Sequence, residues 1–255
     1  MFNHFDLWGH QVHLYNVFMC LGIIAGALSL DKRISQSGIE TELATRIRFL
    51  VAVSIPAGLF FGYLSDRLFI RGGEFTLSSL LNFSSGGFTF LGGLLGAMVM
   101  SLLFCIVFRL PFLFLMNLVI PSIVLGHSFG RIGCFLAGCC FGKPTVFFGG
   151  VRFPEGSLPY QAFGDQHLHP TQLYEAIFLA ALYFLLLRAG NRSRFWIYLA
   201  GYGIARFLLE YLRADTRGTI PGISVLTPSQ VISLIFGVFG VAGLFLFRRE
   251  NGKLS

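Results

Sequence analysis

Long apolar stretches separated by short polar segments run along the whole chain. Seven of them are long enough for an α-helix to cross a bilayer, which takes about 20 residues. They lie near residues 12–30, 49–64, 88–108, 112–129, 171–187, 195–212 and 228–247. This pattern predicts an all-α integral membrane protein with seven transmembrane helices, which form a single membrane domain over residues 1–255. No A-x-A-like cleavage site follows the first stretch, so we expect it to be retained.

Composition supports the membrane assignment. Of the 255 residues, 55% are hydrophobic and only 12% are charged, whereas soluble domains carry about 25% charged residues. The 30 Phe and 31 Gly residues suit lipid-facing surfaces and close helix packing. The net charge of +7 then reflects topology and anionic lipids, so we expect the lipid bilayer and no nucleic acid as a partner.

The distribution of Lys and Arg predicts the orientation. With the N-terminus outside, the cytoplasmic segments carry eleven of these residues: Lys32, Arg33, Arg46, Arg48, Arg109, Arg188, Arg192, Arg194, Arg248, Arg249 and Lys253. The outer segments and their boundaries carry seven: Arg67, Arg71, Arg131, Lys143, Arg152, Arg213 and Arg217. The positive-inside rule therefore predicts an outer N-terminus and a cytoplasmic C-terminus. The long outer segments, 67–87 and 134–169, indicate that the chemistry faces outward, with loop 134–169 over the site.

The fourth span ends in an unusual stretch, residues 126–142, which holds a histidine, an arginine and three cysteines. A charged side chain inside a span costs several kcal/mol unless it is paired, so such residues usually mark a functional site. His127 and Arg131 are four residues apart and share one face of the helix. We therefore place a functional site at this end of the span.

Two further spans carry polar side chains at helical spacing. The fifth opens with HPTQLYE (169–175), in which Pro170 suits the first turn of a helix. The sixth carries a stripe that should face the bundle rather than lipid, formed by Tyr202, Arg206, Glu210 and Arg213. One interpretation is purely structural, with Arg206 paired to Glu210 and Glu175 paired to Arg213. The other is a bound anion, for which a lipid phosphate is the natural choice in a membrane.

The motifs resemble those of the bacterial phosphatidylglycerol:prolipoprotein diacylglyceryl transferase family. The matching segments are LGGLLG (91–96), GRIG (130–133) with Phe135 and Gly142, HPTQLYE (169–175), and GYG (201–203) with Arg206, Glu210 and Arg213. The resemblance implies transfer of a diacylglyceryl group from phosphatidylglycerol to the lipobox cysteine thiol of a preprolipoprotein, with release of glycerol phosphate. It also implies a multi-pass protein of the bacterial cytoplasmic (inner) membrane, without a cofactor, and we expect a monomer.

The resemblance and the polar pattern together give a set of candidate site residues. Arg131 and Arg206 are expected to bind the phosphate and stabilise the leaving group, and His127 or His169 to take the thiol proton. The predicted catalytic residues are Arg131, Arg206, His127, His169 and Tyr202. The predicted substrate-binding residues are Arg131, Gly142, Glu175, Arg206, Glu210, Arg213, Gly92 and Gly93.

The chain departs from the family pattern at chemically important positions. Leu91 stands where the family has a histidine that has been proposed as a base, and Ala137 replaces an asparagine. Two interpretations stay open: a divergent transferase with a substitute base such as His127, or a member with lost or altered catalysis that serves as a lipid-binding or assembly protein. A small-anion transporter is not favoured, because the inner halves of the spans carry little polar character.

The segment after Arg131 also contains three cysteines that the family pattern lacks. Cys134 and Cys139 replace an asparagine and a glutamate of the family pattern, and Cys140 adds a third thiol. The three cysteines could form a disulfide, bind a metal or carry an acyl group. Since adjacent cysteines rarely reach one ion well and no fourth ligand is evident, the sequence favours an extracytoplasmic disulfide and predicts no metal.

Overall fold

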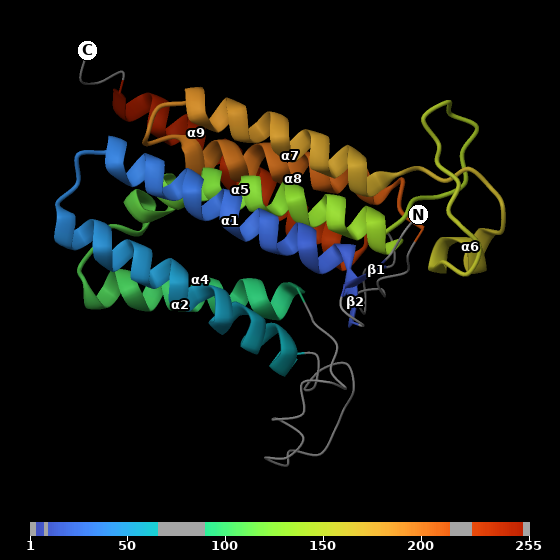
Figure 1. Cartoon of the computed structure of the whole chain (residues 1–255). Helices are drawn as coiled ribbons and strands as arrows, with labels where there is room; N and C mark the ends of the chain where they lie inside the picture. Colours follow the sequence, from blue (N-terminus) through green and yellow to red (C-terminus); the bar gives the residue numbers. More distant parts are fainter. Residues whose placement is uncertain (1–3, 8–9, 66–89, 215–225, 252–255) are drawn as a thin grey trace. The chain divides into compact units, whose positions relative to one another are not determined.

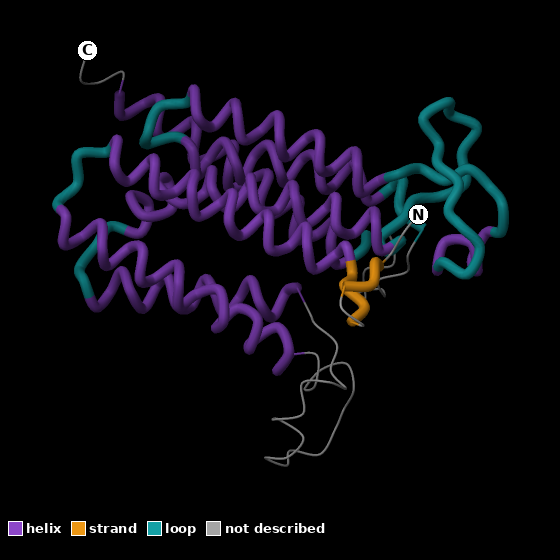
Figure 2. The backbone as a smooth tube through the Cα atoms, in the orientation of Figure 1, coloured by secondary structure: helices purple, strands orange, loops and turns teal. Residues whose placement is uncertain are grey.

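The computed structural model describes residues 4–7, 10–65, 90–214 and 226–251, and most of these residues are helical (Figures 1 and 2). The long helices are α1 (Leu14–Gln36), α2 (Thr41–Ser65), α4 (Phe90–Val107), α5 (Phe112–Ala137), α7 (Thr171–Arg188), α8 (Arg194–Glu210) and α9 (Pro228–Asn251). A short helix, α6 (Leu158–Phe163), lies in the loop between α5 and α7. Strands β1 (His4–Leu7) and β2 (His10–His13) form an antiparallel hairpin.

Each predicted span coincides with one long helix, and the all-helical membrane class is confirmed. Within the described residues, five helices are long and apolar enough to cross a membrane: α1, α2, α5, α7 and α9. Helix α8 spans 17 residues and carries Arg194, Arg206 and Glu210, and the apolar part of α4 is the shorter segment Gly96–Val107. The number seven therefore remains a prediction. The predicted outer segment 67–87 lies outside the described residues.

The chain forms two compact units, and Arg33–Leu115 is the smaller. In it α2 packs against α4, and a Cβ on Gly58 would lie 3.4 Å from the carbonyl oxygen of Gly93. The candidate residues Gly92 and Gly93 and the departure Leu91 all belong to the first turn of α4. The side chain of Leu91 lies outside what the structure describes.

The larger unit, Met1–Lys32 with Met116–Ser255, holds the other polar candidates. Glycines bring its helices into backbone contact, as expected for packing within a membrane. A Cβ on Gly22 of α1 would lie 2.8 Å from the oxygen of Gly126 on α5, and one on Gly203 of α8 would lie 2.5 Å from the nitrogen of Gly237 on α9. Its apolar core is formed by Ile120, Val124, Leu179, Leu182 and Leu186.

The loop between α5 and α7 folds against the end of this unit where α5 ends and α7 begins (Figure 1). Backbone hydrogen bonds tie it to both neighbouring segments: the Gly142 amide donates to the His169 carbonyl, and the Lys143 amide donates to the Leu212 carbonyl, at 3.0 and 2.8 Å. The end of α5, the start of α7 and the end of α8 are thereby joined at one place. The polar candidates of these three helices are brought together as a result.

Candidate active site

The centre of the site is a buried carboxylate. Glu175 on α7 is 1% exposed, and its Oε1 lies 3.1 Å from Nη2 of Arg131 on α5. The hydroxyl of Tyr202 on α8 donates a hydrogen bond of 2.8 Å to the same oxygen. Three helices therefore meet at one carboxylate oxygen. Since an unpaired charge would be very costly here, the ion pair satisfies both Arg131 and Glu175.

His127 completes this network from α5. Its Nε2 accepts a hydrogen bond from Nε of Arg131 at 3.2 Å and lies 3.9 Å from Oε1 of Glu175. The helical spacing of four residues places the two side chains on one face, as predicted. An Nε2 that accepts from a guanidinium carries no proton, so His127 is the neutral imidazole that either a proton acceptor or an orienting group requires.

Two tyrosines that stack on α8 close one side of the network. The ring of Tyr202 packs edge-on against His127 with centroids 5.5 Å apart, and Tyr198 stacks on Tyr202 at 5.6 Å. Tyr198 was not among the predicted residues. Its spacing of four from Tyr202 was the available signal, because it places both rings on one helix face.

A second ion cluster lies further along α8. Nη2 of Arg206 lies 2.7 Å from Oε2 of Glu210, and Nε of Arg213 lies 3.8 Å from the same atom. All three side chains are buried. Among the described residues Nη1 and Nη2 of Arg206 have no hydrogen-bond partner. The contact between Arg206 and Glu210 is therefore an ion pair without a hydrogen bond. A buried guanidinium thus keeps N–H groups that an anion can accept from.

The structural interpretation of the polar stripe was half right. Arg206 pairs with Glu210 as that interpretation proposed, but Glu175 pairs with Arg131 instead of Arg213. Arg213 lies beside Glu210, one helical turn away on its own chain segment. The i, i+4 pair follows from helix geometry alone, whereas the partner of Glu175 depends on how α5 and α7 are rotated about their axes.

Arg131 and Arg206 both act on the same two groups. Each guanidinium contributes to the electrostatic potential at Glu175 and at His127. The two arginines, one on α5 and one on α8, therefore both lie within electrostatic range of Glu175 and His127. The two clusters together contain three guanidinium groups and two carboxylates, which leaves one excess positive charge.

Glu210 is fixed by a contact that the sequence analysis missed. The hydroxyl of Thr227 donates to Oε1 of Glu210 at 3.0 Å. Thr227 also begins α9 in a capping box: its hydroxyl accepts from the Gln230 amide, and Gln230 Oε1 accepts from the Thr227 amide. The segment TPSQ (227–230) carried that signal in the sequence.

His169 has a different setting from His127. Its amide and carbonyl are bonded to Lys143 and Gly142, and its Nδ1 lies 3.3 Å from the hydroxyl of Tyr174. Tyr174 precedes Glu175 by one residue, which is about 100° around α7. The structure therefore joins His169 to the loop, and the side-chain contacts of His169 are with Tyr174 and Phe147.

Gly142 occupies a tight junction. A Cβ at this position would lie 2.6 Å from the carbonyl oxygen of His169 and 2.8 Å from that of Leu212. Real Cβ atoms do not approach backbone so closely. The sequence analysis predicted a substrate-binding role for Gly142, which stays a prediction; the structure shows Gly142 at the point where three chain segments meet.

Three thiols lie beside these clusters. No disulfide joins Cys134, Cys139 and Cys140, contrary to the prediction, and their Sγ atoms lie within 4.8 Å of one another. Gly138 and Cys140 have φ angles of 68° and 62°, which turn the chain sharply after α5 and bring adjacent cysteines to one place. The Cys139 thiol donates to the Cys134 carbonyl at 3.6 Å, and the adjacent Cys134 and Cys139 thiols together with the Arg213 guanidinium lower the pKa of the Cys140 thiol.

The start of α7 holds the backbone of this turn. Nε2 of Gln172 donates to the Cys139 carbonyl at 2.6 Å, and the Thr171 hydroxyl donates to the Cys140 carbonyl at 2.8 Å. Both side chains are fully buried. Thr171 and Gln172 belong to the HPTQLYE segment, but the motif did not predict that their side chains would hold the cysteine turn.

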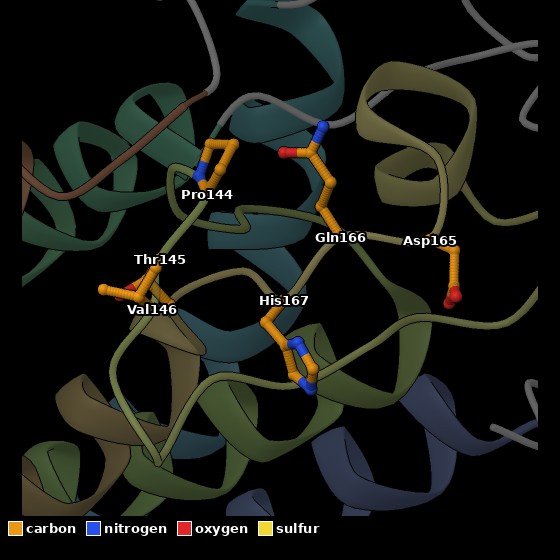
Figure 3. A pocket seen from close by; sticks show the side chains of 6 residues that line it. All are labelled: Pro144, Thr145, Val146, Asp165, Gln166 and His167. Atoms are coloured by element: carbon orange, nitrogen blue, oxygen red, sulfur yellow. The ribbon is translucent and has the colours of Figure 1, made fainter.

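The loop itself carries a shallow hollow of about 590 Å³, shown in Figure 3. It is lined by Pro144, Thr145, Val146, Asp165, Gln166 and His167. The two stretches that line it are paired by a hydrogen bond of 2.8 Å from the Thr145 amide to the His167 carbonyl. None of the predicted site residues lines this hollow, although all six lining residues belong to loop 134–169.

Comparison with known proteins identifies the family. The chain matches the prolipoprotein diacylglyceryl transferase family over residues 3–246. It is 35% identical to a phosphatidylglycerol–prolipoprotein diacylglyceryl transferase of Clostridium tetani, over 96% of this chain and 98% of that protein. Proteins with this name from Clostridium perfringens (numbered 2) and Stenotrophomonas maltophilia are 32% and 31% identical, over 97% and 94% of this chain and 95% and 89% of theirs. The chain therefore belongs to the prolipoprotein diacylglyceryl transferase family.

Proposed function

We propose that this protein transfers the diacylglyceryl group of phosphatidylglycerol to the lipobox cysteine thiol of prolipoproteins and releases glycerol phosphate. Family membership and the names of the similar proteins support this reaction. The structural observation that carries the proposal is the excess positive charge of the two ion clusters, together with the free N–H groups of buried Arg206. A phosphodiester headgroup supplies one negative charge and the acceptor oxygens that this arrangement lacks.

The chemistry is a substitution at a glycerol carbon. The thiolate sulfur forms a bond to that carbon while the carbon–oxygen bond to the phosphate breaks, and the departing phosphate takes the electron pair. Its charge increases as it leaves, so guanidinium groups directed at it stabilise the transition state more than the ground state. Arg131 and Arg206 fill this role, and Glu175 and Glu210 hold them in place.

Seven spans with an outer N-terminus place this site on the outer side of the bacterial cytoplasmic membrane, where prolipoproteins emerge. The positive-inside distribution of Lys and Arg and the seven long helices support that arrangement. Loop 134–169 then lies over the site and receives the lipobox peptide. The protein acts as a monomer in this proposal.

A direct assay tests the reaction. The purified protein, incubated with phosphatidylglycerol and a lipobox peptide, is expected to form a thioether-linked diacylglyceryl peptide that mass spectrometry detects. Expression in a bacterium depleted of its own transferase is expected to restore growth. A well-expressed, folded protein that fails in both experiments would contradict the proposal.

The second candidate is a lipid-binding or assembly protein without catalysis, and Leu91 motivates it, because the family histidine is missing there. Such a protein would still bind anionic lipid through Arg131 and Arg206. Binding of phosphatidylglycerol vesicles without turnover, combined with no rescue of growth, would favour it over the transferase.

A further inference from the structure

We propose that Cys134, Cys139 and Cys140 bind a zinc ion whose open fourth position takes the acceptor cysteine of the substrate peptide. The inference rests on the proposed transferase function and adds a metal-activated thiolate to it. The zinc ion also replaces the base that is missing because Leu91 stands at the position of the family histidine. A thiol coordinated to zinc stays ionised without a separate base.

The sulfur geometry fits one ion. The three Sγ atoms lie within 4.8 Å of one another. Tetrahedral zinc with Zn–S bonds of about 2.3 Å separates its sulfur ligands by about 3.8 Å, so side-chain movements of about 1 Å suffice. The sequence argument against a metal was that adjacent cysteines rarely reach one ion. The positive φ of Cys140 removes that objection, because it turns Cys139 and Cys140 toward Cys134.

The surrounding residues fix these ligands as metal sites require. The carbonyls of Cys139 and Cys140 accept hydrogen bonds from Gln172 and Thr171, which are buried at the start of α7. Outer-shell hydrogen bonds of this kind orient the ligands and are characteristic of metal sites. A turn held at two carbonyls keeps three thiols together without a covalent link between them.

The charges around the cluster suit a zinc–thiolate centre. Zn²⁺ with three thiolates carries a net charge of −1, and a fourth thiolate makes it −2. Arg131 acts electrostatically on Cys134, and the Arg213 guanidinium hydrogen-bonds the Cys140 thiol. Each of these cations also faces a carboxylate, Glu175 or Glu210, so together they offset part of the negative charge of the centre.

Three ligands indicate a reactive centre rather than a structural one. Structural zinc sites close all four positions with protein ligands, whereas catalytic sites leave one open. No fourth His, Cys, Asp or Glu joins the cluster within the part of the chain that the structure describes. The three cysteines are partly exposed, and Cys134 lies three residues after Arg131 on the same face of α5. A thiol bound at the open position is therefore delivered beside the arginine that holds the phosphate.

The step balances without any oxidant. The acceptor thiol loses its proton to water as its sulfur binds zinc. That sulfur then attacks the glycerol carbon, the carbon–oxygen bond breaks, and glycerol phosphate leaves with the electron pair. The thioether product is neutral and a weaker zinc ligand than a thiolate, so it dissociates and reopens the fourth position.

The metal content of the full-length protein tests the site independently of activity. Protein purified in detergent, or supplied with zinc after purification, is expected to hold about one zinc per chain by elemental mass spectrometry. Cys134→Ser, Cys139→Ser and Cys140→Ser are each expected to lower that content, and the triple variant to abolish it. Cys20→Ser serves as the control, because Cys20 is exposed on α1 outside the cluster. Unchanged zinc in the triple variant, or no zinc in wild type, would overturn the proposal.

Cobalt substitution reports the coordination geometry. Co²⁺ in place of zinc is expected to show the visible absorption of a tetrahedral thiolate site, and the lipobox peptide is expected to change that spectrum. A peptide whose cysteine is replaced by serine is expected to leave it unchanged. An octahedral spectrum, or a disulfide among the three cysteines in wild-type protein, would contradict the assignment.

Activity separates the two proposals. Removal of zinc with a chelator is expected to lower transfer about 100-fold, at the low end of what loss of assisted proton transfer removes, and added zinc is expected to restore it. Full transfer by metal-free protein would refute the zinc inference and leave the transferase intact. Zinc-loaded protein that binds the peptide thiol and performs no transfer would refute the transferase and leave the metal site intact.

Discussion

Arg131 on α5 and Glu175 on α7 meet at 3.1 Å in the larger unit, where the Glu175 side chain is 2% exposed and the Arg131 side chain 12%. Removing one charge leaves the other uncompensated. We expect Glu175→Gln to reduce the free energy of unfolding by about 3 kcal/mol, the size of effect seen when a buried pair is broken. Thermal unfolding in detergent measures it. Tyr202→Phe removes one hydrogen bond to the same carboxylate, and we expect a loss of about 1.5 kcal/mol.

These two substitutions are expected not to be additive, because Tyr202 and Arg131 share one oxygen of Glu175. The double variant Glu175→Gln, Tyr202→Phe should therefore lose less stability than the sum of the two single variants. Full additivity would show that the hydroxyl stabilises the protein through another contact.

Arg206 offers the sharpest test of phosphate binding. Its Nη1 lacks a partner among the described residues, so Arg206→Gln removes donors that the protein itself does not use. We expect transfer to fall about 10²–10³-fold, as when one donor to a developing anion is lost. Arg206→Lys should also be impaired, because a planar donor becomes a point charge. Arg188→Gln, an exposed position at the end of α7, is the matched control and should keep full activity.

His127 and Arg131 give a prediction about positioning. Because Nε2 of His127 accepts from Nε of Arg131, His127→Gln preserves an acceptor and His127→Phe removes it. We expect the Gln variant to retain most of kcat/KM and the Phe variant to lose about 10-fold or more. The acid limb of the pH–rate profile should be the same in wild type, His127→Gln and His169→Gln. A displaced limb in one variant alone would identify that histidine as the general base.

The junction at Gly142 predicts a strong steric effect. A methyl group there would overlap the carbonyl oxygens of His169 and Leu212, neither of which can move as a side chain can. We expect Gly142→Ala to destabilise the protein by about 3 kcal/mol, the upper end for overpacking, and to abolish transfer. Gly201→Ala is the control: its nearest neighbour would be Leu182 Cδ1 at an ordinary 3.6 Å, so it should unfold at or above the wild-type temperature.

The sequence predicted which segments are helical much better than where the helices end. Helix α5 continues to Ala137, eight residues beyond the predicted end at 129. Hydropathy shows only where the apolar residues end. The polar stretch that follows is still helical because its glycines pack against α1: a Cβ on Gly133 would lie 3.3 Å from the ring of Tyr15. The extension is what carries Arg131 and Cys134.

Contacts within one helix were predictable and contacts between helices were not. The spacing of four residues gave the pairs His127–Arg131 and Arg206–Glu210 directly. The partner of Glu175 depends on helix rotation, which no local pattern encodes. The cysteine cluster depends on a backbone turn with positive φ at Cys140. Non-glycine residues rarely adopt this angle, so nothing in the sequence predicted the turn.

The glycine contacts have a consequence for how a lipid reaches the arginines. At Gly22–Gly126 and at Gly203–Gly237 the backbones touch with no side chain between them, so α1 with α5, and α8 with α9, leave no width for an acyl chain. A diacylglycerol tail is wider than these gaps, and parting either pair would break close packing along its length. Within the larger unit, a lipid must therefore enter from the bilayer between helices that these glycines do not hold together. Bulky substitutions between such helices would slow lipid entry without changing the rate of the chemical step.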